Sequence, residues 1–199
     1  MNPNQPHTLP PDYFDGIYRA HPDPWGFETS PYEQAKYADT VAALPRPRYE
    51  SAFEVGCSLG VLTELLAARC GHLLAIDVAA APLERARQRC AHLPQVEFQH
   101  LLLPAEFPAG RVFDLIVLSE VGYYWAAPDL ARVAGQLLTA LRPGGQLLLV
   151  HWTPPVPDYP LTGDEVHEFF LAQAGPAGPL EQLHGHRAAQ YRLDLLARR

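Results

Sequence analysis

The fold is most constrained by residues 53–60, FEVGCSLG, in which an apolar run is closed by an acidic residue and by two glycines four positions apart. Residues 61–68 continue with the apolar spacing of a helix. This order predicts a strand, a tight turn and a helix, which is the opening of an α/β nucleotide-binding unit. Gly56 and Gly60 suit a backbone that needs unusual φ and ψ and that a ligand approaches closely. The N-terminal N–H groups of the following helix point back at the same turn.

The spacing E-x-G-x-x-x-G differs from the two common phosphate-binding patterns. No lysine follows the glycines, which argues against a P-loop. The glycines are also placed differently from those of the dinucleotide fingerprint, which argues against a pyrophosphate cradle. Glu54, at the end of the strand, would repel a pyrophosphate and attract an ammonium group. A glycine pattern this short also occurs in ordinary βα turns, so it does not identify a ligand alone.

Length, charge and cysteine content restrict the class of protein. A chain of 199 residues suits one domain, and its net charge of −7 disfavours a nucleic-acid partner. The chain has no apolar run long enough to span a membrane, and its first 20 residues lack a signal-peptide pattern. The three cysteines are widely spaced, without a disulfide framework or metal-ligand spacing. We therefore expect a cytoplasmic protein with no membrane contact and no metal site.

The chain divides into three parts. Residues 1–11 are expected to be a disordered tail, and residues 12–47 a helical lid. The second lid helix is predicted from Pro31 onward, with Ser30 as its N-cap and Glu33 completing a capping box. Residues 48–199 alternate strands and helices, with strands expected at 51–56, 72–77, 96–100, 112–118 and 146–152 and a strand or strand pair at 186–197. This α/β pattern predicts a Rossmann-like doubly wound sheet of about seven strands, mostly parallel, with helices on both faces.

Asp77 lies 21 residues after Gly56, at the end of the second predicted strand. An acid at this place is positioned to accept hydrogen bonds from a ribose diol. In a doubly wound sheet the ligand lies over the carboxyl ends of the strands, and the same edge carries residues 100–103, 119–120 and 151–152. The alternative role for Asp77 is a helix-capping or surface carboxylate.

Two further motifs join these features. FDLIV opens the fourth strand and LRPGG precedes the fifth, so the pattern covers residues 50–152. The chain resembles the class I S-adenosylmethionine-dependent methyltransferases. More narrowly, it is similar to the nodulation protein S family of N-methyltransferases, on DPWGF at 23–27, YE and KY within 32–37, FEVGCSLGVLT at 53–63 and SEVGYY at 119–124. Members of that family methylate an amino group on a sugar or chitooligosaccharide.

The resemblance implies S-adenosylmethionine as the cofactor. The residues expected to contact it are Trp25, Tyr32, Lys36, Glu54, Gly56, Ser58, Gly60, Asp77, Leu102 and Ser119. In this reading the glycines border the amino-acid part, Glu54 lies near its ammonium group and Asp77 holds the ribose hydroxyls. Lys36 would pair with the methionine carboxylate. Trp25 and Tyr32 would contact the cofactor or serve as a hydrophobic latch on the sheet edge.

The region after the third strand departs from the family pattern. Many class I methyltransferases carry an acid there that accepts the adenine amino group. Residues 100–106 read HLLLPAE, without an acid at the expected place. Adenine would then be held by residues 101–103 through packing and backbone groups. Glu106 is too far along unless the loop folds back.

Candidate catalytic residues follow from the chemistry of methyl transfer. A sulfonium is an activated donor, so the enzyme mainly positions the nucleophile, and an amine nucleophile needs an acceptor for its proton. The candidates at the sheet edge are Glu120, Tyr123, Tyr124 and His151. His151 ends the fifth strand and is expected to face the crevice. The alternatives are a structural hydrogen bond for His151, a cap for Glu120 and helix packing for Tyr124.

The sequence therefore predicts methyl transfer from S-adenosylmethionine to a small polar acceptor, an amine of a sugar-like molecule such as an amino sugar or oligosaccharide. Two alternatives stay open at this point: a small-molecule O-methyltransferase, and a non-catalytic protein that binds S-adenosylmethionine. A nicotinamide-dependent oxidoreductase is disfavoured because the chain lacks G-x-G-x-x-G.

Overall fold

A computed structural model describes residues 7–199. Two helices come first, α1 (Pro11–Ala20) and α2 (Pro31–Ala42). The elements of the sheet and its covering helices follow in the order β1 (Tyr49–Val55), α3 (Val61–Ala67), β2 (Cys70–Asp77), α4 (Ala80–Arg89), β3 (Val96–His100), β4 (Phe113–Ser119), the 3-10 turn η1 (Gly122–Tyr124), α5 (Ala127–Ala140), β5 (Leu141–Trp152), α6 (Gly163–Leu171), β6 (Leu180–Arg187) and β7 (Tyr191–Arg198).

The seven strands form one sheet in the order β3-β2-β1-β4-β5-β7-β6. Strands β1 to β5 pair in parallel, whereas β7 runs antiparallel to both β5 and β6. The predicted α/β class and the mostly parallel seven-stranded sheet are confirmed. The C-terminal region forms a strand pair, one of the two possibilities that the sequence left open.

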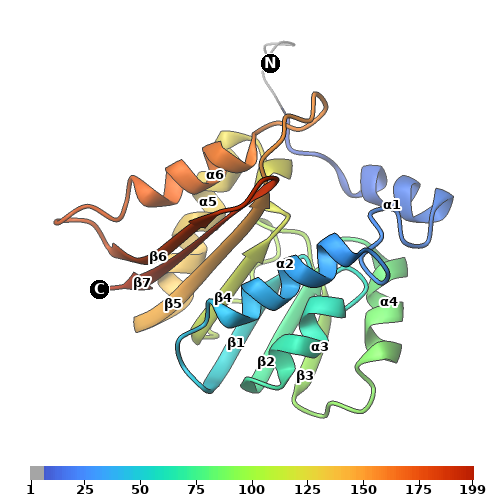
Figure 1. Ribbon diagram of the computed structural model, residues 1–199, viewed down its shortest axis with the longest axis horizontal. Coiled ribbons are helices and arrows are strands. Elements are labelled where there is room, and N and C mark those ends of the chain that lie inside the picture. Colours follow the sequence, from blue (N-terminus) through green and yellow to red (C-terminus); the bar gives the residue numbers. More distant parts are fainter. Residues whose placement is uncertain (1–6) are drawn as a thin grey trace.

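Helices cover both faces of the sheet, with α2 and α3 in front of it and α5 and α6 behind it (Figure 1). Side chains alternate between the faces along each strand. In β1, Phe53 and Val55 join the core under α5 and α6, whereas Ala52 joins the core under α2 and α3. Because both faces are covered, β1 is buried from Ala52 to Val55 and β4 from Leu115 to Ser119.

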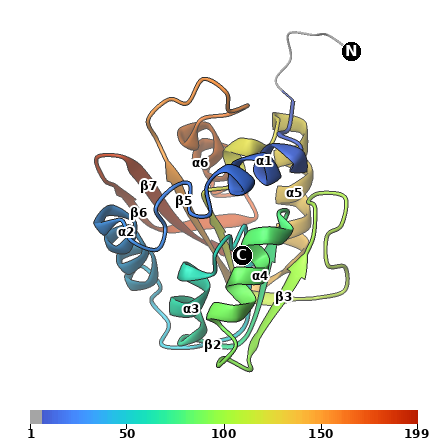
Figure 2. The ribbon, with the colours of Figure 1, turned by 90° about the vertical axis from the view of Figure 1, so that its right-hand side faces the viewer.

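Helix α1 lies across the carboxyl edge of the parallel strands, above α4 (Figure 2). Its Phe14 is buried and meets the Tyr124 ring edge-on, with the ring centroids 4.8 Å apart. Helix α2 begins as predicted, since the Ser30 hydroxyl accepts the Glu33 N–H at 3.4 Å and Pro31 follows. The predicted capping box at α2 is wrong, because the Glu33 side chain pairs with Lys36 instead.

The expected N-terminal tail differs from the structure over its last residues, while residues 1–6 lie outside the described part. The Leu9 N–H donates to the Tyr124 carbonyl at 2.9 Å, and the Thr8 hydroxyl accepts the Ala126 N–H at 2.9 Å. Thr8 also bonds to Asp129 in the first turn of α5. Ala126 is the N-cap of α5, and the Thr8 hydroxyl joins the Ala126 N–H to the Asp129 carboxylate. Disorder up to residue 11 is therefore an incorrect prediction for residues 8–11.

Among the described residues, no helix is both long and apolar enough to cross a membrane.

Candidate active site

A cavity of about 470 Å³ lies over the carboxyl ends of β1, β2 and β4, where residues 8–36 and the segment 152–159 enclose it. This volume falls within the range of small-molecule sites. Eleven of the predicted site residues line it: Trp25, Tyr32, Lys36, Gly56, Ser58, Asp77, Leu102, Ser119, Glu120, Tyr123 and Tyr124. Three others, Glu54, Gly60 and His151, do not line it.

The two glycines of the loop after β1 are required for different reasons. Gly56 has φ +80°, and a Cβ there would lie 2.1 Å from Cγ2 of Val121. Gly60 has φ +75°, and a Cβ there would lie 2.9 Å from Cβ of Ala86 in α4. Gly56 therefore shapes the cavity floor. Gly60 acts from outside the cavity, because it allows α4 to pack against the loop.

Asp77 closes β2 and faces the cavity from its floor. Its Oδ2 accepts the Ser58 N–H and its Oδ1 accepts the Ala79 N–H, both at 2.8 Å. Burial raises the pKa of this carboxyl above its ordinary value. Each oxygen still has a lone pair free to accept a hydroxyl group. Asp77 thus combines the two roles left open by the sequence, since it holds the glycine loop and the start of α4 and also presents a carboxylate to the cavity.

Glu54 points to the α3 face of the sheet. Its Oε2 accepts the Thr63 hydroxyl at 2.6 Å, and burial raises its pKa to about 7. The side chain lines a separate recess of about 30 Å³, which Gly56 and Ser119 also border. Its separation from the larger cavity follows from strand alternation, because Glu54 shares a face with Ala52. Contact between Glu54 and a cofactor ammonium group stays a prediction.

Lys36 of α2 lies between two carboxylates. Its Nζ is 2.6 Å from Oε1 of Glu120 and 3.0 Å from Oε1 of Glu33. Glu120 has φ +58°, and its Oε2 accepts the Tyr123 hydroxyl at 2.5 Å and the Trp152 N–H at 2.9 Å. The predicted partner of Lys36 was a cofactor carboxylate, whereas the structure pairs it within the chain. The cavity wall thus has a surplus of negative charge, which favours a cationic ligand.

Aromatic side chains form much of the remaining wall. Trp25 stacks on Phe27 with the ring centroids 5.4 Å apart, and the Tyr32 ring meets Trp152 edge-on at 5.9 Å. The Tyr32 hydroxyl oxygen is buried without a hydrogen-bond partner. The Tyr124 hydroxyl lies 3.4 Å from that of Tyr159. An aromatic wall with unused hydroxyl capacity suits a ligand that has both rings and polar groups.

Sequence reasoning missed several residues of the cavity wall, of which Tyr18, Glu33 and Tyr159 are examples. The Tyr18 hydroxyl lies 2.5 Å from the Ser58 Oγ, and its place on the same helix face as Phe14 was the available signal. The sequence predicts that the Glu33 side chain completes a capping box, whereas in the structure it pairs with Lys36. Tyr159 comes from a proline-rich loop whose sequence has no periodic pattern, so no signal indicated it.

The loop after β3 folds back on itself. The Leu102 N–H donates to Oε2 of Glu106 at 2.8 Å, and the Glu106 N–H donates to the Leu102 carbonyl at 2.9 Å. Glu106 is exposed and does not line the cavity, whereas Leu101 to Leu103 do. The departure seen in the sequence is thus present in the structure, and the cavity wall here is apolar.

The expectation that His151 faces the crevice is wrong. Its side chain is fully buried, and its Nε2 accepts the Gly122 N–H at 3.1 Å. Burial holds the pKa of His151 well below its ordinary value. The cause is again strand alternation, because His151 shares the α6 face with Leu147 and Leu149 whereas Trp152 faces the cavity. His151 is therefore not placed to take a proton from a molecule in the cavity.

Within residues 7–199, no group of three or more His, Cys, Asp or Glu side chains is arranged to hold a metal ion.

Comparison with known proteins places this site in a family. The family model described as nodulation protein S matches residues 18–151. Nodulation protein S of Rhizobium tropici is 35% identical over 131 residues, which are 63% of this chain and 53% of that protein. That of Bradyrhizobium diazoefficiens is 38% identical over 103 residues, which are 51% of this chain and 49% of that protein. The chain thus spans about half the length of the curated relatives it matches.

Solved structures agree with this assignment. A putative methyltransferase from Pseudomonas syringae is 41% identical, with a TM-score of 0.70 over 84% of this chain and 99% of that one. The N-methyltransferase NodS from Bradyrhizobium japonicum WM9, in complex with S-adenosyl-L-homocysteine, shares the fold with a TM-score of 0.80 at 22% identity, over 92% of this chain and 96% of that one. The chain therefore belongs to the nodulation protein S family.

Proposed function

We propose that this chain transfers a methyl group from S-adenosylmethionine to an amine of a small, sugar-like acceptor. The observation that carries the proposal is the surplus of carboxylates in the cavity wall, which contains Asp77, Glu33 and Glu120 and one lysine, Lys36, paired with the two glutamates. A sulfonium cofactor and an ammonium-bearing acceptor are both cations, so this cavity attracts both. The shared fold with the N-methyltransferase NodS from Bradyrhizobium japonicum WM9 supports the same proposal.

The residues of the cavity fit the proposed cofactor. Asp77 has free lone pairs for a pair of ribose hydroxyls, and Gly56 leaves no side chain between the loop and a ligand. Leu101 to Leu103 offer apolar packing to an adenine ring. When bound, S-adenosylmethionine supplies a methyl group that is already activated by its sulfonium. The work left to the chain is to orient the acceptor and to manage its proton.

Glu120 is the residue placed to manage that proton. Tyr123 and the Trp152 N–H fix its Oε2. Nζ of Lys36 contacts its Oε1 at 2.6 Å. An acceptor ammonium first gives one proton to Glu120, which releases it to solvent. The nitrogen lone pair of the neutral amine then forms the bond to the methyl carbon as the carbon–sulfur bond breaks, and S-adenosyl-L-homocysteine is the leaving group. Tyr124 and Tyr159 offer ring faces on which a sugar ring stacks.

A methyl-transfer assay with matched acceptors tests the proposal. The protein is incubated with methyl-labelled S-adenosylmethionine and glucosamine oligomers, either fully deacetylated or fully N-acetylated. We expect label only on the deacetylated oligomers, at nitrogen. Glu120→Gln should lower kcat, measured at saturating cofactor, by roughly a hundredfold, because it removes the proton acceptor but keeps the shape. Glu181→Gln, at an exposed position in β6, is the control.

Other outcomes separate the alternatives. Label on hydroxyl oxygen would indicate an O-methyltransferase. Tight cofactor binding without labelling of any amine or hydroxyl acceptor would indicate a non-catalytic binding protein. Full activity of Glu120→Gln would remove Glu120 from the mechanism.

A further inference from the structure

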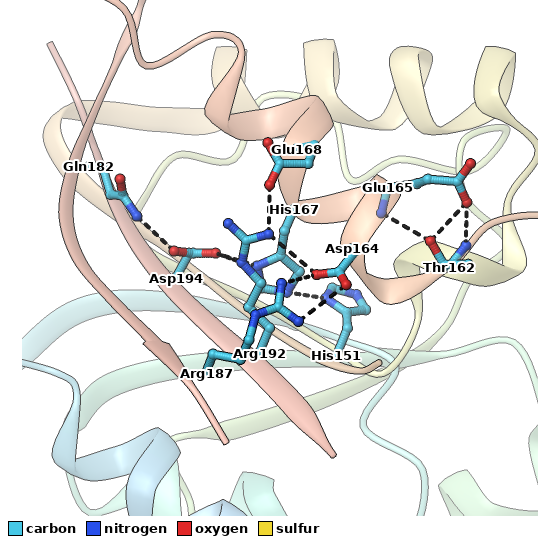
Figure 3. Close-up of polar contacts among 10 residues, drawn as sticks. All are labelled: His151, Thr162, Asp164, Glu165, His167, Glu168, Gln182, Arg187, Arg192 and Asp194. Atoms are coloured by element: carbon cyan, nitrogen blue, oxygen red, sulfur yellow. Dashed lines mark hydrogen bonds and ion pairs between the residues drawn. The ribbon is translucent and has the colours of Figure 1, made fainter. Parts of the chain in front are cut away.

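Behind the wall of the cavity, three buried side chains form a continuous chain of hydrogen bonds. His151 comes from the end of β5, His167 from α6 and Asp194 from β7 (Figure 3). Their residues are 0%, 0% and 1% exposed. The chain runs from the backbone of the cavity wall to the antiparallel strand β7. Polar groups so deeply buried are costly unless every one of them is paired.

The two ends of the chain fix the direction of every bond in it. At one end the Gly122 N–H, which only donates, lies 3.1 Å from Nε2 of His151. Nδ1 of His151 lies 3.1 Å from Nε2 of His167, and Nδ1 of His167 lies 2.6 Å from Oδ2 of Asp194. An ionised carboxylate only accepts. Each imidazole therefore carries its proton on Nδ1 and accepts on Nε2.

The far end of the chain is firmly anchored. Oδ1 of Asp194 accepts from Nε2 of Gln182 at 2.7 Å, and its Oδ2 lies 2.8 Å from Nε of Arg192. Arg192 also pairs with Glu168 at 2.7 Å and with Asp164 at 3.3 Å, both in α6 (Figure 3). Strands β6 and β7 and helix α6 thus hold the carboxylate in place.

The other end of this chain of hydrogen bonds is Gly122 in the cavity wall, which is tightly packed against His151 and Val166. A Cβ on Gly122 would lie 2.9 Å from Nε2 of His151 and 2.5 Å from Cγ1 of Val166. Next along the turn, Tyr123 donates its hydroxyl to Glu120 at 2.5 Å. Glu120 itself has φ +58°, a conformation that persists only where its surroundings impose it. Fixing Gly122 therefore fixes the turn that aims the Glu120 carboxylate into the cavity.

We propose that His151, His167 and Asp194 form a positioning chain for methyl transfer, which holds the 120–124 turn so that Glu120 meets the acceptor. The proposal rests on the function proposed above for Glu120. His151 is in this view a positioning residue and touches neither cofactor nor acceptor.

This chain of hydrogen bonds is complete only while both imidazoles are neutral. One added proton places an N–H against another N–H, either at Gly122 or between the two rings. The charged and titratable groups around the pair are Lys36, Tyr123, Asp164, Arg192 and Asp194. Burial lowers the pKa of both histidines, which preserves the neutral pair near neutral pH.

Two amide variants of His151 test the proposal. The amide of glutamine reaches the place of Nε2, so His151→Gln keeps an acceptor for the Gly122 N–H. The shorter asparagine reaches only the place of Nδ1, so His151→Asn keeps the contact to His167 and leaves Gly122 without a partner. Hydrogen exchange at the Gly122 amide is compared in the complexes of both variants with S-adenosyl-L-homocysteine. Their kcat is compared separately, with S-adenosylmethionine and deacetylated glucosamine oligomers as substrates.

We expect His151→Asn to speed Gly122 exchange and to lower kcat, each by roughly tenfold, while His151→Gln stays near wild type and cofactor affinity is unchanged. Equal exchange or equal kcat in the two variants would overturn the proposal. If wild type transfers no methyl group, the function of the previous section fails separately. The positioning of the turn is then still tested by hydrogen exchange at the Gly122 amide and by the NMR chemical shift of the Glu120 carboxyl carbon. Both should differ from wild type in His151→Asn and not in His151→Gln. The NMR chemical shifts of the imidazole nitrogens test the hydrogen-bond directions in the wild-type protein. A proton on Nε2 of His151 would also contradict the proposal.

Discussion

At the scale of single residues, burial raises the pKa of the Glu54 and Asp77 carboxyl groups. Glu54 is fully buried, and its pKa of about 7 lies above the ordinary 4.5. A group whose pKa is raised on folding contributes its stability fully below the unfolded pKa, and that contribution is lost as pH rises through the folded pKa. The window for Glu54 therefore extends from pH 4.5 to about 7.

Glu54→Gln removes this titration and keeps the shape of the side chain. The variant should gain stability relative to wild type as pH rises through this window, because only wild type must bury a charge at high pH. Urea denaturation at about pH 5 and about pH 8 measures the difference. Glu181→Gln, on the exposed strand β6, should show no such pH dependence. A Glu54→Gln difference that is constant with pH would contradict the assignment.

Gly56 combines a left-handed backbone with a close approach, so Gly56→Ala should be costly. The added Cβ meets Val121 at 2.1 Å, and the φ of +80° disfavours alanine. We expect a loss of about 1–3 kcal/mol in the free energy of unfolding, together with weaker cofactor binding. Gly135→Ala is the matched control, because its Cβ meets nothing within 4 Å inside α5 and should stabilise the helix. Equal stability changes in the two variants would refute this account.

Single residues also show what the sequence predicts and where it stops. Gly56 and Asp77 were found because their spacing along the chain fixes their place on the sheet edge. His151 was misplaced because its position at the edge was considered without the alternation of β5, which the sequence contains. The partners of Lys36 were not predictable in this way. Glu120 lies 84 positions away, and only the packing of α2 across the sheet brings the two together.

At the scale of elements, one carboxylate joins the lid to the core. Glu28, in the loop before α2, pairs with Arg85 of α4 at 2.7 Å and also with Arg89. Nε of Arg89 donates to the Leu59 carbonyl in the glycine loop at 3.0 Å. This contact therefore ties the lid, α4 and the cofactor loop together.

Glu28→Gln should loosen the lid and speed cofactor release. Partly exposed ion pairs contribute up to about 1 kcal/mol, so we expect dissociation of S-adenosyl-L-homocysteine to accelerate by up to about fivefold at low salt. The difference should shrink at high salt, because screening weakens the pair in wild type. Stopped-flow displacement measures the rate. Glu84→Gln, which loses a pair with Arg87 within α4, is the control, and an equal rate in both variants would exclude this role.

The start of α2 is an element that the sequence predicts well. Ser30 caps this helix as expected, because capping depends on residues within one turn. The ordering of residues 8–10 was not predictable from local sequence. The partner of Thr8, Ala126, lies 118 positions along the chain, so its contribution depends on the completed fold.

At the scale of the whole molecule, the sheet order brings segments from distant parts of the chain to one edge. The cavity is lined by residues from Thr8 to Tyr159, and its carboxylates share the sign of the net charge of −7. Alternation of strands and helices fixes this edge, so the place of the site follows from the sequence. The acceptor depends on the shape of the lid and of the segment 152–159, which local patterns do not specify.

The most direct test of the central claim is a calorimetric titration of the protein with S-adenosyl-L-homocysteine. We expect wild type to bind with micromolar affinity, and Asp77→Asn to bind about tenfold to a hundredfold more weakly because one acceptor becomes a donor. Asp158→Asn, at an exposed position in the loop before α6, should bind as wild type does. Thermal melts of the three proteins separate lost binding from lost folding. No binding by wild type, or equal binding by folded Asp77→Asn, would contradict the cofactor site described above.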